Sequence, residues 1–501
     1  MSDSLFERIQ AAIPDDPATP FLATAERTYS YGDLDRRSSA IGHALRAQGV
    51  GKGDRVAVQA EKSPQAIFLY LACLRIGAVY LPLNTAYTLS ELDYFFGDAE
   101  PRVIVCDPAR QREVRGLTGA RRATVLTLDA AGQGSLIDAA TDWGDLAPVP
   151  CDPDDLAALL YTSGTTGRSK GAMLTHRNLV SNALALRETW GFTDADVLLH
   201  VLPIYHTHGL FVATNTVLLA GARMIFLPRF DPDAVIPALP RATVMMGVPT
   251  YYARLLARAD FTVDAARSIR VFISGSAPLL EETFGAFEAR PGHRILERYG
   301  MTETGMNTSN PLHGERRAGT VGLPLPGVEV RVAGEDGTPL ARGEAGILEV
   351  RGPNVFKGYW RMPEKTAEEL REDGFFITGD VGVISEDGYV SIVGRAKDLV
   401  ISGGLNVYPK EVESLIDRLP GVVESAVIGL PHPDFGEAVT AVVVRHPDAG
   451  ITEIDIITAA RAELAGFKVP KMVLFVETLP RNTMGKVQKN LLRADYGDTF
   501  R

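Results

Sequence analysis

A glycine- and hydroxyl-rich segment follows an apolar run in the first half of the chain. The sequence LLYTSGTTGRSKGAMLTH occupies residues 159–176. Its apolar start predicts a buried strand. The residues that follow predict a loop whose backbone N–H groups and hydroxyls contact phosphate oxygens, with Lys170 adding charge. Ser169 and Gly171 replace the glycine and the hydroxyl residue that flank the lysine of a Walker A loop. A flexible linker is the alternative interpretation, but a linker is not expected directly after a buried strand.

Further motifs rich in polar and charged residues follow this segment in order. They are PIYHTHG (203–209), SGSAPL (274–279), ERYGMTETG (297–305), EVRGPNVFKGYW (349–360), TGD (378–380), GRAKDLVISGGLNVYPKEVE (394–413) and LPRNTMGKVQKNLLR (479–493). The whole set resembles the adenylate-forming superfamily, which includes acyl-CoA synthetases, firefly luciferases and the adenylation domains of peptide synthetases. The resemblance covers nearly the entire chain.

The resemblance implies a two-step reaction between anionic groups. A carboxylate attacks the α-phosphate of ATP to give an acyl adenylate and pyrophosphate, and a thiol then displaces AMP. Cations must neutralise the charge that gathers at the α-phosphate. By resemblance, Lys486 bridges the carboxylate and the α-phosphate, while Glu303 and Thr165 hold Mg²⁺. A solvated surface lysine is the alternative for Lys486, which is also a candidate for regulatory acetylation.

The resemblance assigns the contacts with ATP to several loops. Tyr299 is expected to stack on adenine, with the turn at 275–277 lining the other side of the base. Asp380 is expected to accept hydrogen bonds from the ribose hydroxyls, with Arg395 as a second ribose or phosphate contact; ordinary surface charges are the alternative. The expected ATP-binding residues are Thr162, Ser163, Gly164, Thr165, Thr166, Gly167, Lys170, Gly275, Ser276, Ala277, Glu297, Tyr299, Gly300, Met301, Thr302, Asp380, Arg395 and Lys486.

The resemblance also predicts a movement of the C-terminal part. Lys397 matches the family's hinge, about which the C-terminal domain rotates between the half-reactions and carries Lys486 away. The loop with Ser402, Gly403 and Gly404 is then expected to contact coenzyme A, because residues without a Cβ let the pantetheine arm approach closely. A simple turn is the alternative interpretation of the paired glycines.

Two residues near the expected acyl pocket indicate the kind of acid. Arg298 directly precedes Tyr299, and His206 lies in the PIYHTHG motif. A cation and a hydrogen-bond donor would stabilise a second carboxylate at the far end of a short substrate, whereas an unpaired arginine facing an alkyl chain would be costly. Both motifs are similar to those of malonyl-CoA synthetases, which implies malonate as the substrate. Methylmalonate is also expected to be tolerated, because one methyl group changes binding by only about 1–3 kcal/mol.

Other interpretations of these two residues stay open. Arg298 could instead form an ion pair with Glu297, Glu303 or Glu315. His206 could be a satisfied core histidine, or half of a metal pair with the second histidine of its motif, although a third ligand at recognisable spacing is lacking.

Other functions are also possible from the sequence. A synthetase for another short-chain or aryl acid is the main alternative. An amino acid substrate is disfavoured, because PIYHTHG has no acidic residue to pair with an ammonium group and no carrier domain is expected after the last motif. Nothing supports a luciferase-like oxygenase. A silent sensor of ATP or acyl-CoA is disfavoured because Lys486, Glu303, Asp380 and Arg395 are all retained.

The composition is that of a globular protein. The chain has 501 residues, of which 46% are hydrophobic and 23% charged, and a formal net charge of -11, which disfavours binding to nucleic acids. Cys73, Cys106 and Cys151 are too few for a disulfide framework. No secretory signal is apparent, and no apolar stretch reaches the ~20 residues that span a bilayer. We expect a cytoplasmic protein without a membrane partner.

The elements that must position these residues follow an alternating pattern. Short apolar runs at 102–107, 224–230 and 270–275 alternate with helical segments such as SELDYFFGDAE, for which Ser90 is the expected N-cap. This pattern predicts an α/β fold with mainly parallel sheets. We expect a large N-terminal domain (1–396) of two packed α/β subdomains plus a small antiparallel β subdomain from about residue 320. A mobile α+β C-terminal domain (397–501), with the hinge at 397, is expected to follow.

Overall fold

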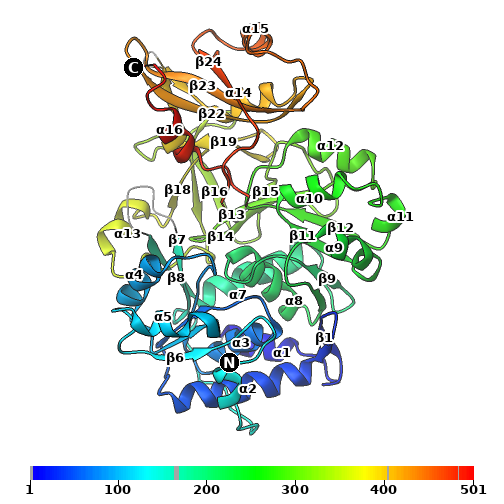
Figure 1. Ribbon diagram of the computed structural model, residues 1–501, viewed down its shortest axis with the longest axis vertical. Helices are drawn as coiled ribbons and strands as arrows, with labels where there is room; N and C mark the ends of the chain where they lie inside the picture. Colours follow the sequence, from blue (N-terminus) through cyan, green and yellow to red (C-terminus); the bar gives the residue numbers. More distant parts are fainter. Residues whose placement is uncertain (1–3, 163–168, 403–404, 483–484, 501) are drawn as a thin grey trace.

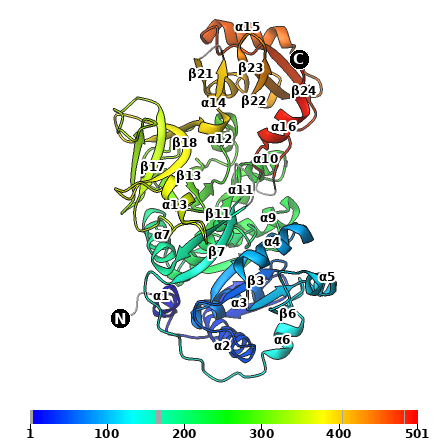
Figure 2. The ribbon, with the colours of Figure 1, turned by 90° about the vertical axis from the view of Figure 1, so that its left-hand side faces the viewer.

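The structure, a computed structural model, describes residues 4–162, 169–402, 405–482 and 485–500. Four β-sheets organise this part of the chain. Figure 1 and Figure 2 show two α/β units at the base, a small β unit beside them, and the C-terminal unit at the opposite end. This architecture confirms the expected fold class, whereas the boundary at residue 397 stays a prediction.

The first unit contains a six-stranded sheet. Its order is β6 (Thr124–Thr127), β5 (Val103–Cys106), β3 (Arg55–Gln59), β4 (Val79–Pro82), β7 (Leu156–Thr162) and β8 (Lys170–Thr175). The pairs from β6 through β7 are parallel, and β8 is antiparallel to β7. The accompanying helices are α2 (Tyr31–Ala47), α3 (Pro64–Arg75), α4 (Leu89–Ala99), η1 (Pro108–Arg110), α5 (Gln111–Gly116) and α6 (Ser135–Ala139).

The second unit contains a nine-stranded sheet. Its order is β15 (Leu323–Pro324), β14 (Gly305–Ser309), β13 (Leu296–Met301), β12 (Val271–Ser274), β11 (Val244–Gly247), β9 (Val197–His200), β10 (Arg223–Phe226), β1 (Pro20–Ala23) and β2 (Thr28–Ser30). Strands β13 to β1 pair in parallel, and both edges are antiparallel. Its helices are α1 (Leu5–Ala12), α7 (His176–Thr189), η2 (His208–Thr214), α8 (Asn215–Leu219), α9 (Pro232–Ala238), η3 (Leu239–Arg241), α10 (Pro249–Leu256), α11 (Val263–Ala266) and α12 (Glu281–Ala289).

Two smaller sheets complete the described chain. The antiparallel sheet of β16 (Glu329–Ala333), β17 (Gly346–Arg351), β18 (Phe376–Ile384) and β19 (Val390–Arg395) has α13 (Pro363–Glu369) in its β17–β18 connection. After η4 (Ala396–Asp398), the C-terminal sheet has the order β21 (Leu405–Val407), β20 (Val400–Ser402), β23 (Gly436–Arg445) and β22 (Val422–His432), with β24 (Met472–Val476) on β23. Its helices are α14 (Pro409–Ile416), α15 (Glu453–Glu463) and α16 (Lys489–Tyr496).

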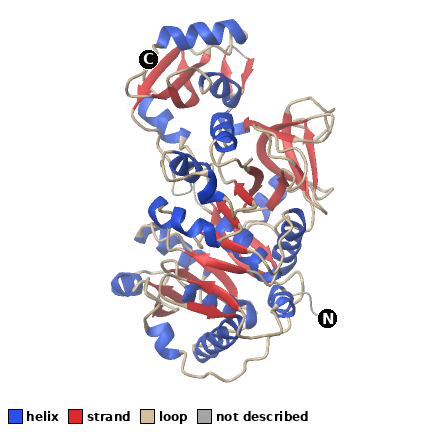
Figure 3. Ribbon diagram, turned by 90° about the vertical axis from the view of Figure 1, so that its right-hand side faces the viewer, coloured by secondary structure: helices blue, strands red, loops and turns tan. Residues whose placement is uncertain are grey.

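A continuous apolar core joins the first two units. Helix α3 is buried from Ala66 to Arg75 and belongs to the same cluster as side chains from β1, α7 and β9. Figure 3 shows helices flanking these sheets, as expected where parallel strands are buried on both faces. Among the described residues, no helix has both the length and the apolar character needed to cross a bilayer.

The start of α4 corrects one expectation. Its N-cap is Thr88, not Ser90, and a capping box joins the Thr88 side chain to Glu91. Threonine three residues before glutamate is the preferred pairing for this box. The acid three residues after Ser90 is Asp93, which instead accepts a hydrogen bond from the backbone N–H of Gly119 at 2.7 Å.

Candidate active site

Glu303 lies buried between β13 and β14, beside Thr162 at the end of the apolar strand β7. Its Oε1 accepts a hydrogen bond from the Thr162 hydroxyl at 3.2 Å and lies 3.2 Å from the Tyr359 hydroxyl. Burial raises the pKa of Glu303. A buried carboxylate with hydroxyls beside it offers the hard oxygen donors that Mg²⁺ prefers. Thr165, the other expected ligand, lies outside the described residues.

The described part of the chain contains no group of three or more His, Cys, Asp and Glu side chains that could hold a metal ion alone. Protein Mg²⁺ sites commonly use one or two carboxylates together with substrate phosphates. Glu303 therefore fits a Mg²⁺ ion whose other ligands include the phosphate oxygens of bound ATP.

Lys170 is held at the end of the phosphate loop by residues that the sequence analysis did not identify. Its Nζ lies 2.9 Å from a Glu369 carboxylate oxygen and 4.1 Å from the Tyr359 ring centroid. The Tyr359 hydroxyl donates to Glu369 at 2.6 Å. Glu369 and Tyr359 thus link Lys170 to the Glu303 carboxylate. The other expected loop residues, Ser163, Gly164, Thr165, Thr166 and Gly167, lie outside the described residues.

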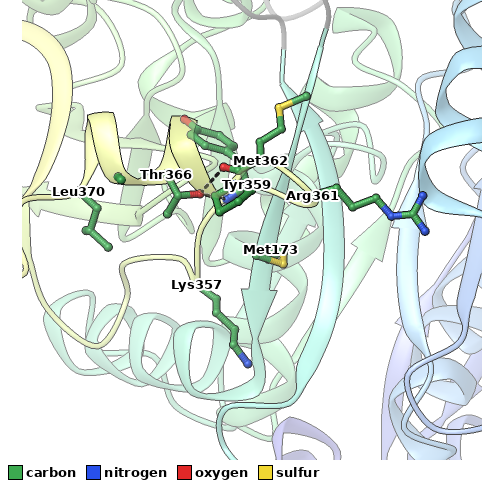
Figure 4. A pocket seen from close by; sticks show the side chains of 9 residues that line it. Met173, Lys357, Tyr359, Arg361, Met362, Thr366 and Leu370 are labelled. Carbon is green, nitrogen blue, oxygen red and sulfur yellow. Dashed lines mark hydrogen bonds between the residues drawn. The ribbon is translucent and has the colours of Figure 1, made fainter.

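An open groove adjoins this network. It has a volume of about 420 Å³ and is lined by Met173, Lys357, Tyr359, Arg361, Met362, Pro363, Thr366, Ala367 and Leu370. Figure 4 shows the hydrogen bond by which the backbone N–H of Tyr359 donates to the Thr366 hydroxyl, at 2.9 Å. This bond ties the GYW segment to α13, which also carries Glu369. Helix α13 therefore positions Tyr359 beside Glu303.

Asp380 brings together the expected ribose contacts. Its carboxylate accepts a hydrogen bond from the Tyr299 hydroxyl at 2.5 Å and forms an ion pair with Arg395 Nε at 2.6 Å. The Tyr299 ring packs with Val321 and Leu348 in a small apolar cluster. Tyr299 and Arg395 therefore orient Asp380, and stacking of adenine on Tyr299 stays a prediction.

Lys486 enters the same region from the C-terminal unit. Arg395 and Asp380 are among the charged groups that act on its ammonium group. The Lys486 side chain is exposed to solvent, but neighbouring protein groups remove part of the water around its ammonium group. This loss of water lowers the pKa of Lys486 to about 8. An added Cβ at Gly485 would lie 3.2 Å from Thr250 Oγ1, so the loop reaches α10 of the N-terminal part.

Arg298 is buried on β13. Among the described residues, its Nε and Nη2 atoms have no hydrogen-bond partner. Burial lowers the pKa of Arg298 to about 9. Gly275 leaves room for the guanidinium, because an added Cβ there would stand 2.4 Å from Arg298 Cζ. The site therefore presents a desolvated cation with unused donors.

Two histidines adjoin this cation. The His208 backbone N–H donates to His206 Nδ1 at 3.3 Å, and His208 Nδ1 lies 3.2 Å from the Ser276 hydroxyl. His208 Nε2 is buried and finds no partner among the residues that the structure describes. Burial, reinforced by the Arg298 charge, lowers the pKa of His206 to about 4 and that of His208 as well. Ser276 has a φ of 73°, a left-handed conformation that is costly for a residue with a Cβ. The sequence analysis identified His206 but missed the role of His208.

The structure also addresses the alternatives for Arg298. Among the described residues, no ion pair joins Arg298 to a carboxylate. Glu297, which burial gives a pKa of about 8, accepts a hydrogen bond from the Leu279 backbone N–H at 3.1 Å. Glu315 pairs with Arg317 at 2.8 Å. The three glutamates therefore leave Arg298 available for a ligand.

The remaining predicted residues lie at several places in the described chain. The backbone at Gly300 approaches Gly305, since an added Cβ would stand 2.1 Å from the Gly305 oxygen. The Thr302 hydroxyl lies 3.5 Å from that of Thr207. Ser402 is buried at the end of β20, whereas Gly403 and Gly404 lie outside the described residues. Met301 ends β13, Ala277 follows Ser276, and Lys397 lies in η4.

The fold and the site define an AMP-binding enzyme. The family model named AMP-binding enzyme matches residues 6–360, and that of the AMP-binding enzyme C-terminal domain matches residues 411–486. The chain belongs to this family. The resemblance found in the motifs is thereby confirmed.

Individual relatives are similar over nearly the full length. The crystal structure of ATP-bound MatB from Rhodopseudomonas palustris is 57% identical, covers 100% of both chains and superposes with a TM-score of 0.98. A feruloyl-CoA synthase from Amycolatopsis is 38% identical over 93% of this chain and 94% of its own. A malonate–CoA ligase from Arabidopsis thaliana is 34% identical over 93% of this chain and 84% of its own.

Proposed function

We propose that this chain is an AMP-forming ligase that joins malonate to coenzyme A through a malonyl adenylate. The observation that carries the proposal is Arg298, a buried guanidinium whose Nε and Nη2 have no partner in the part of the chain that the structure describes. A buried cation without a partner is costly, so its retention calls for an anionic ligand. The distal carboxylate of malonate supplies that anion, while its other carboxylate reacts with ATP.

The relatives support two kinds of acid, and Arg298 discriminates between them. Malonate is named for the Arabidopsis ligase and feruloyl-CoA for the Amycolatopsis enzyme. Ferulate has a bulky aromatic tail without a second carboxylate, so its binding would leave the Arg298 guanidinium unpaired. His206 and His208 beside Arg298 carry no negative charge that could replace a carboxylate. The geometry therefore favours a short dicarboxylate over an aryl acid.

In the first half-reaction, the reacting anions bind where the N-terminal and C-terminal units meet. Arg298 and the histidines fix the distal carboxylate of malonate, so the other carboxylate faces ATP. Lys486 brings a positive charge to the attacking carboxylate and the α-phosphate, while Asp380 accepts hydrogen bonds from the ribose. Bound Mg²⁺, held by Glu303 and Thr165, would neutralise phosphate charge.

The second half-reaction requires another arrangement of the C-terminal unit. We place the domain boundary between residues 396 and 397, with Lys397 as the hinge. Rotation there withdraws Lys486 and brings the loop of Ser402, Gly403 and Gly404 to the acyl adenylate. The thiol of coenzyme A then attacks the acyl carbon, and AMP leaves.

Regulation and location complete the proposal. Acetylation of Lys486 would remove the charge that adenylation needs and would stop the first half-reaction. The side chain is open to solvent, as such a modification requires. In the described part of the chain, Cys73, Cys106 and Cys151 are buried and form no disulfide, which fits the reducing cytoplasm.

A screen of acids tests the proposal directly. Purified protein with ATP, Mg²⁺ and coenzyme A is given acetate, butyrate, octanoate, benzoate, ferulate, malonate, methylmalonate or succinate, and AMP formation is measured. Malonate should give the highest kcat/KM, with methylmalonate second. Preference for ferulate or butyrate over malonate would reject the dicarboxylate assignment but leave acid–CoA ligation intact. No acid-dependent AMP formation would reject the ligase.

A further inference from the structure

A buried lysine outside the residues described so far joins the two α/β units. Lys62 lies in the loop between β3 and α3, and only 9% of its surface is exposed. Its Nζ lies 2.9 Å from Nδ1 of His200 and donates to the His200 carbonyl oxygen at 2.9 Å. The ammonium position is also 4.3 Å from the Phe226 ring centroid. Among the described residues, no carboxylate forms an ion pair with Lys62.

These contacts determine the tautomer of His200. The Nε2 atom of His200 lies 2.9 Å from the carbonyl oxygen of Gly209, which can only accept a hydrogen bond. Nε2 therefore carries the proton. Burial and the Lys62 charge hold the pKa of His200 well below its usual value, so the imidazole is neutral, and Nδ1, which then carries no proton, accepts a hydrogen bond from Lys62. Lys62 has enough N–H groups for both of its contacts in either protonation state.

The bond from His200 to Gly209 closes the loop that carries His206 and His208. His200 ends β9, and Gly209 lies in the π-helix η2. At Gly209 the chain turns back so closely that an added Cβ would stand 2.0 Å from the Pro203 oxygen. The Thr214 hydroxyl donates to the same Gly209 oxygen at 3.0 Å. The two histidines beside Arg298 are thus held by a chain of hydrogen bonds that runs from Lys62 through His200 to Gly209. We call this chain the relay.

We propose that Lys62 is a positioning residue for acid binding: it fixes His200 as the Nε2–H tautomer, whose bond to Gly209 holds the loop of residues 201–208 against Arg298. The inference deepens the proposed function and rests on the acid pocket assigned there. Lys62 itself touches no reacting atom. Its loss should therefore weaken binding of the acid more than binding of ATP or the chemical step.

The test compares Lys62→Met with wild type in acid-dependent pyrophosphate exchange. Methionine keeps the apolar stem and removes the donor. Because a buried hydrogen-bonded partner is lost, we expect the KM for malonate to rise by about 5- to 100-fold. The KM for ATP and kcat should each change by less than about threefold. Lys52→Met, at an exposed lysine paired with Asp155, is the matched control and should leave all three constants unchanged. Equal changes in the two KM values would overturn the inference.

A second variant separates positioning from general stability. In His200→Gln the amide N–H replaces the Nε2 donor, and no ring tautomer remains to be fixed. His200→Gln should keep the malonate KM within about threefold of wild type, whereas His200→Leu should raise it as Lys62→Met does. Adding Lys62→Met to His200→Gln should then have little further effect. If Lys62→Met does not fold, the His200 pair decides: equal malonate KM values for Gln and Leu would overturn the inference.

The proposed function can fail separately. Wild-type turnover with malonate tests that function, whereas the ratios between variants test only the relay. They can be measured with whichever acid the wild type prefers. A wild type that ignores malonate would reject the dicarboxylate assignment. Unchanged ratios in an enzyme that uses malonate would reject only the role of Lys62.

Discussion

The Arg298 guanidinium occupies the space that a side chain at Gly275 would need. An added Cβ would stand 2.4 Å from Arg298 Cζ and 2.5 Å from Nη1. Gly275 follows β12, the strand that pairs in parallel with β13, on which Arg298 lies. The absent side chain at Gly275 thus leaves the space that the long Arg298 side chain fills from the neighbouring strand. This relationship explains how the guanidinium is accommodated there, although no described carboxylate pairs with it.

Gly275→Ala should therefore disturb Arg298 before it disturbs the fold. A methyl group cannot lie 2.4 Å from the guanidinium carbon, so the arginine must move away from its position beside the histidines. We expect kcat/KM for malonate to fall by about tenfold or more, because a misplaced charge loses one charge-assisted hydrogen bond. Steady-state kinetics check this. Gly285→Ala, where no atom lies within 4 Å, is the matched control. Unchanged malonate kinetics in Gly275→Ala would contradict the geometry.

Arg298→Met should stabilise the ligand-free protein and lower its activity with malonate. Removing a buried cation without a partner should raise the free energy of unfolding of the ligand-free protein by about 1–3 kcal/mol, which urea denaturation measures. The same change removes the partner of the distal carboxylate. It should cost about 2–5 kcal/mol of transition-state stabilisation, or roughly 30-fold to several thousand-fold in kcat/KM for malonate.

Butyrate provides the control for Arg298→Met. Its methyl end makes no use of the cation, so turnover should stay the same or increase. If malonate and butyrate lose activity by the same factor, Arg298 supports ATP binding or the fold, and the dicarboxylate assignment loses its physical basis. A less stable variant would show that Arg298 has a structural partner.

The sequence predicted those features that depend on short segments. Apolar runs at 102–107 and 270–275 became β5 and β12, and the structure brings Asp380 and Arg395 of two separate motifs near the ammonium group of Lys486, while their roles stay predictions. The exact N-cap of α4 was wrong, because either hydroxyl residue fits a cap and only the pairing with Glu91 distinguishes them.

The residues that support the site could not be predicted in this way. Lys62 and His200 are 138 positions apart, and Lys170 and Glu369 are 199 apart. No local spacing or periodicity relates such partners, since only the packing of separate units brings them together. His208 was missed because its unpartnered Nε2 becomes apparent only in the folded chain. A sequence shows which residues can do chemistry more readily than which residues hold them.

The pKa of Lys486 predicts the pH dependence of adenylation. Burial lowers this pKa to about 8, so the free enzyme carries the needed positive charge below pH 8 and loses it as the pH rises through that value. We expect kcat/KM for malonate-dependent pyrophosphate exchange to decline above about pH 8. Bound phosphates favour the charged form, so kcat should decline at a higher pH.

Two substitutions at Lys486 check this assignment. Lys486→Arg keeps a permanent charge and should abolish the decline, whatever its absolute rate. Lys486→Ala should cripple pyrophosphate exchange yet still convert supplied malonyl adenylate and coenzyme A to the thioester. A decline that persists in Lys486→Arg would assign the titration to another group, and equal loss of both half-reactions in Lys486→Ala would show that Lys486 is not specific to adenylation.

The turn at η4 allows the hinge to be tested with two neighbouring prolines. Proline fixes φ near about −65°, which matches the range of a 3₁₀ turn, so Lys397→Pro should favour the described orientation, with Lys486 near Asp380 and Arg395. Pyrophosphate exchange should survive, while thioester formation from supplied malonyl adenylate should fall at least about tenfold, because the proposed rotation must precede that step. Ala396→Pro is the matched control. Residue 396 begins the same turn, and the extended backbone of Arg395 (φ -108°, ψ 140°) suits the residue before proline. This variant leaves the backbone dihedrals of Lys397 unconstrained. Both half-reactions should continue in that variant. Full thioester formation in Lys397→Pro would refute rotation about Lys397, and equal loss in both variants would assign the effect to the turn as a whole.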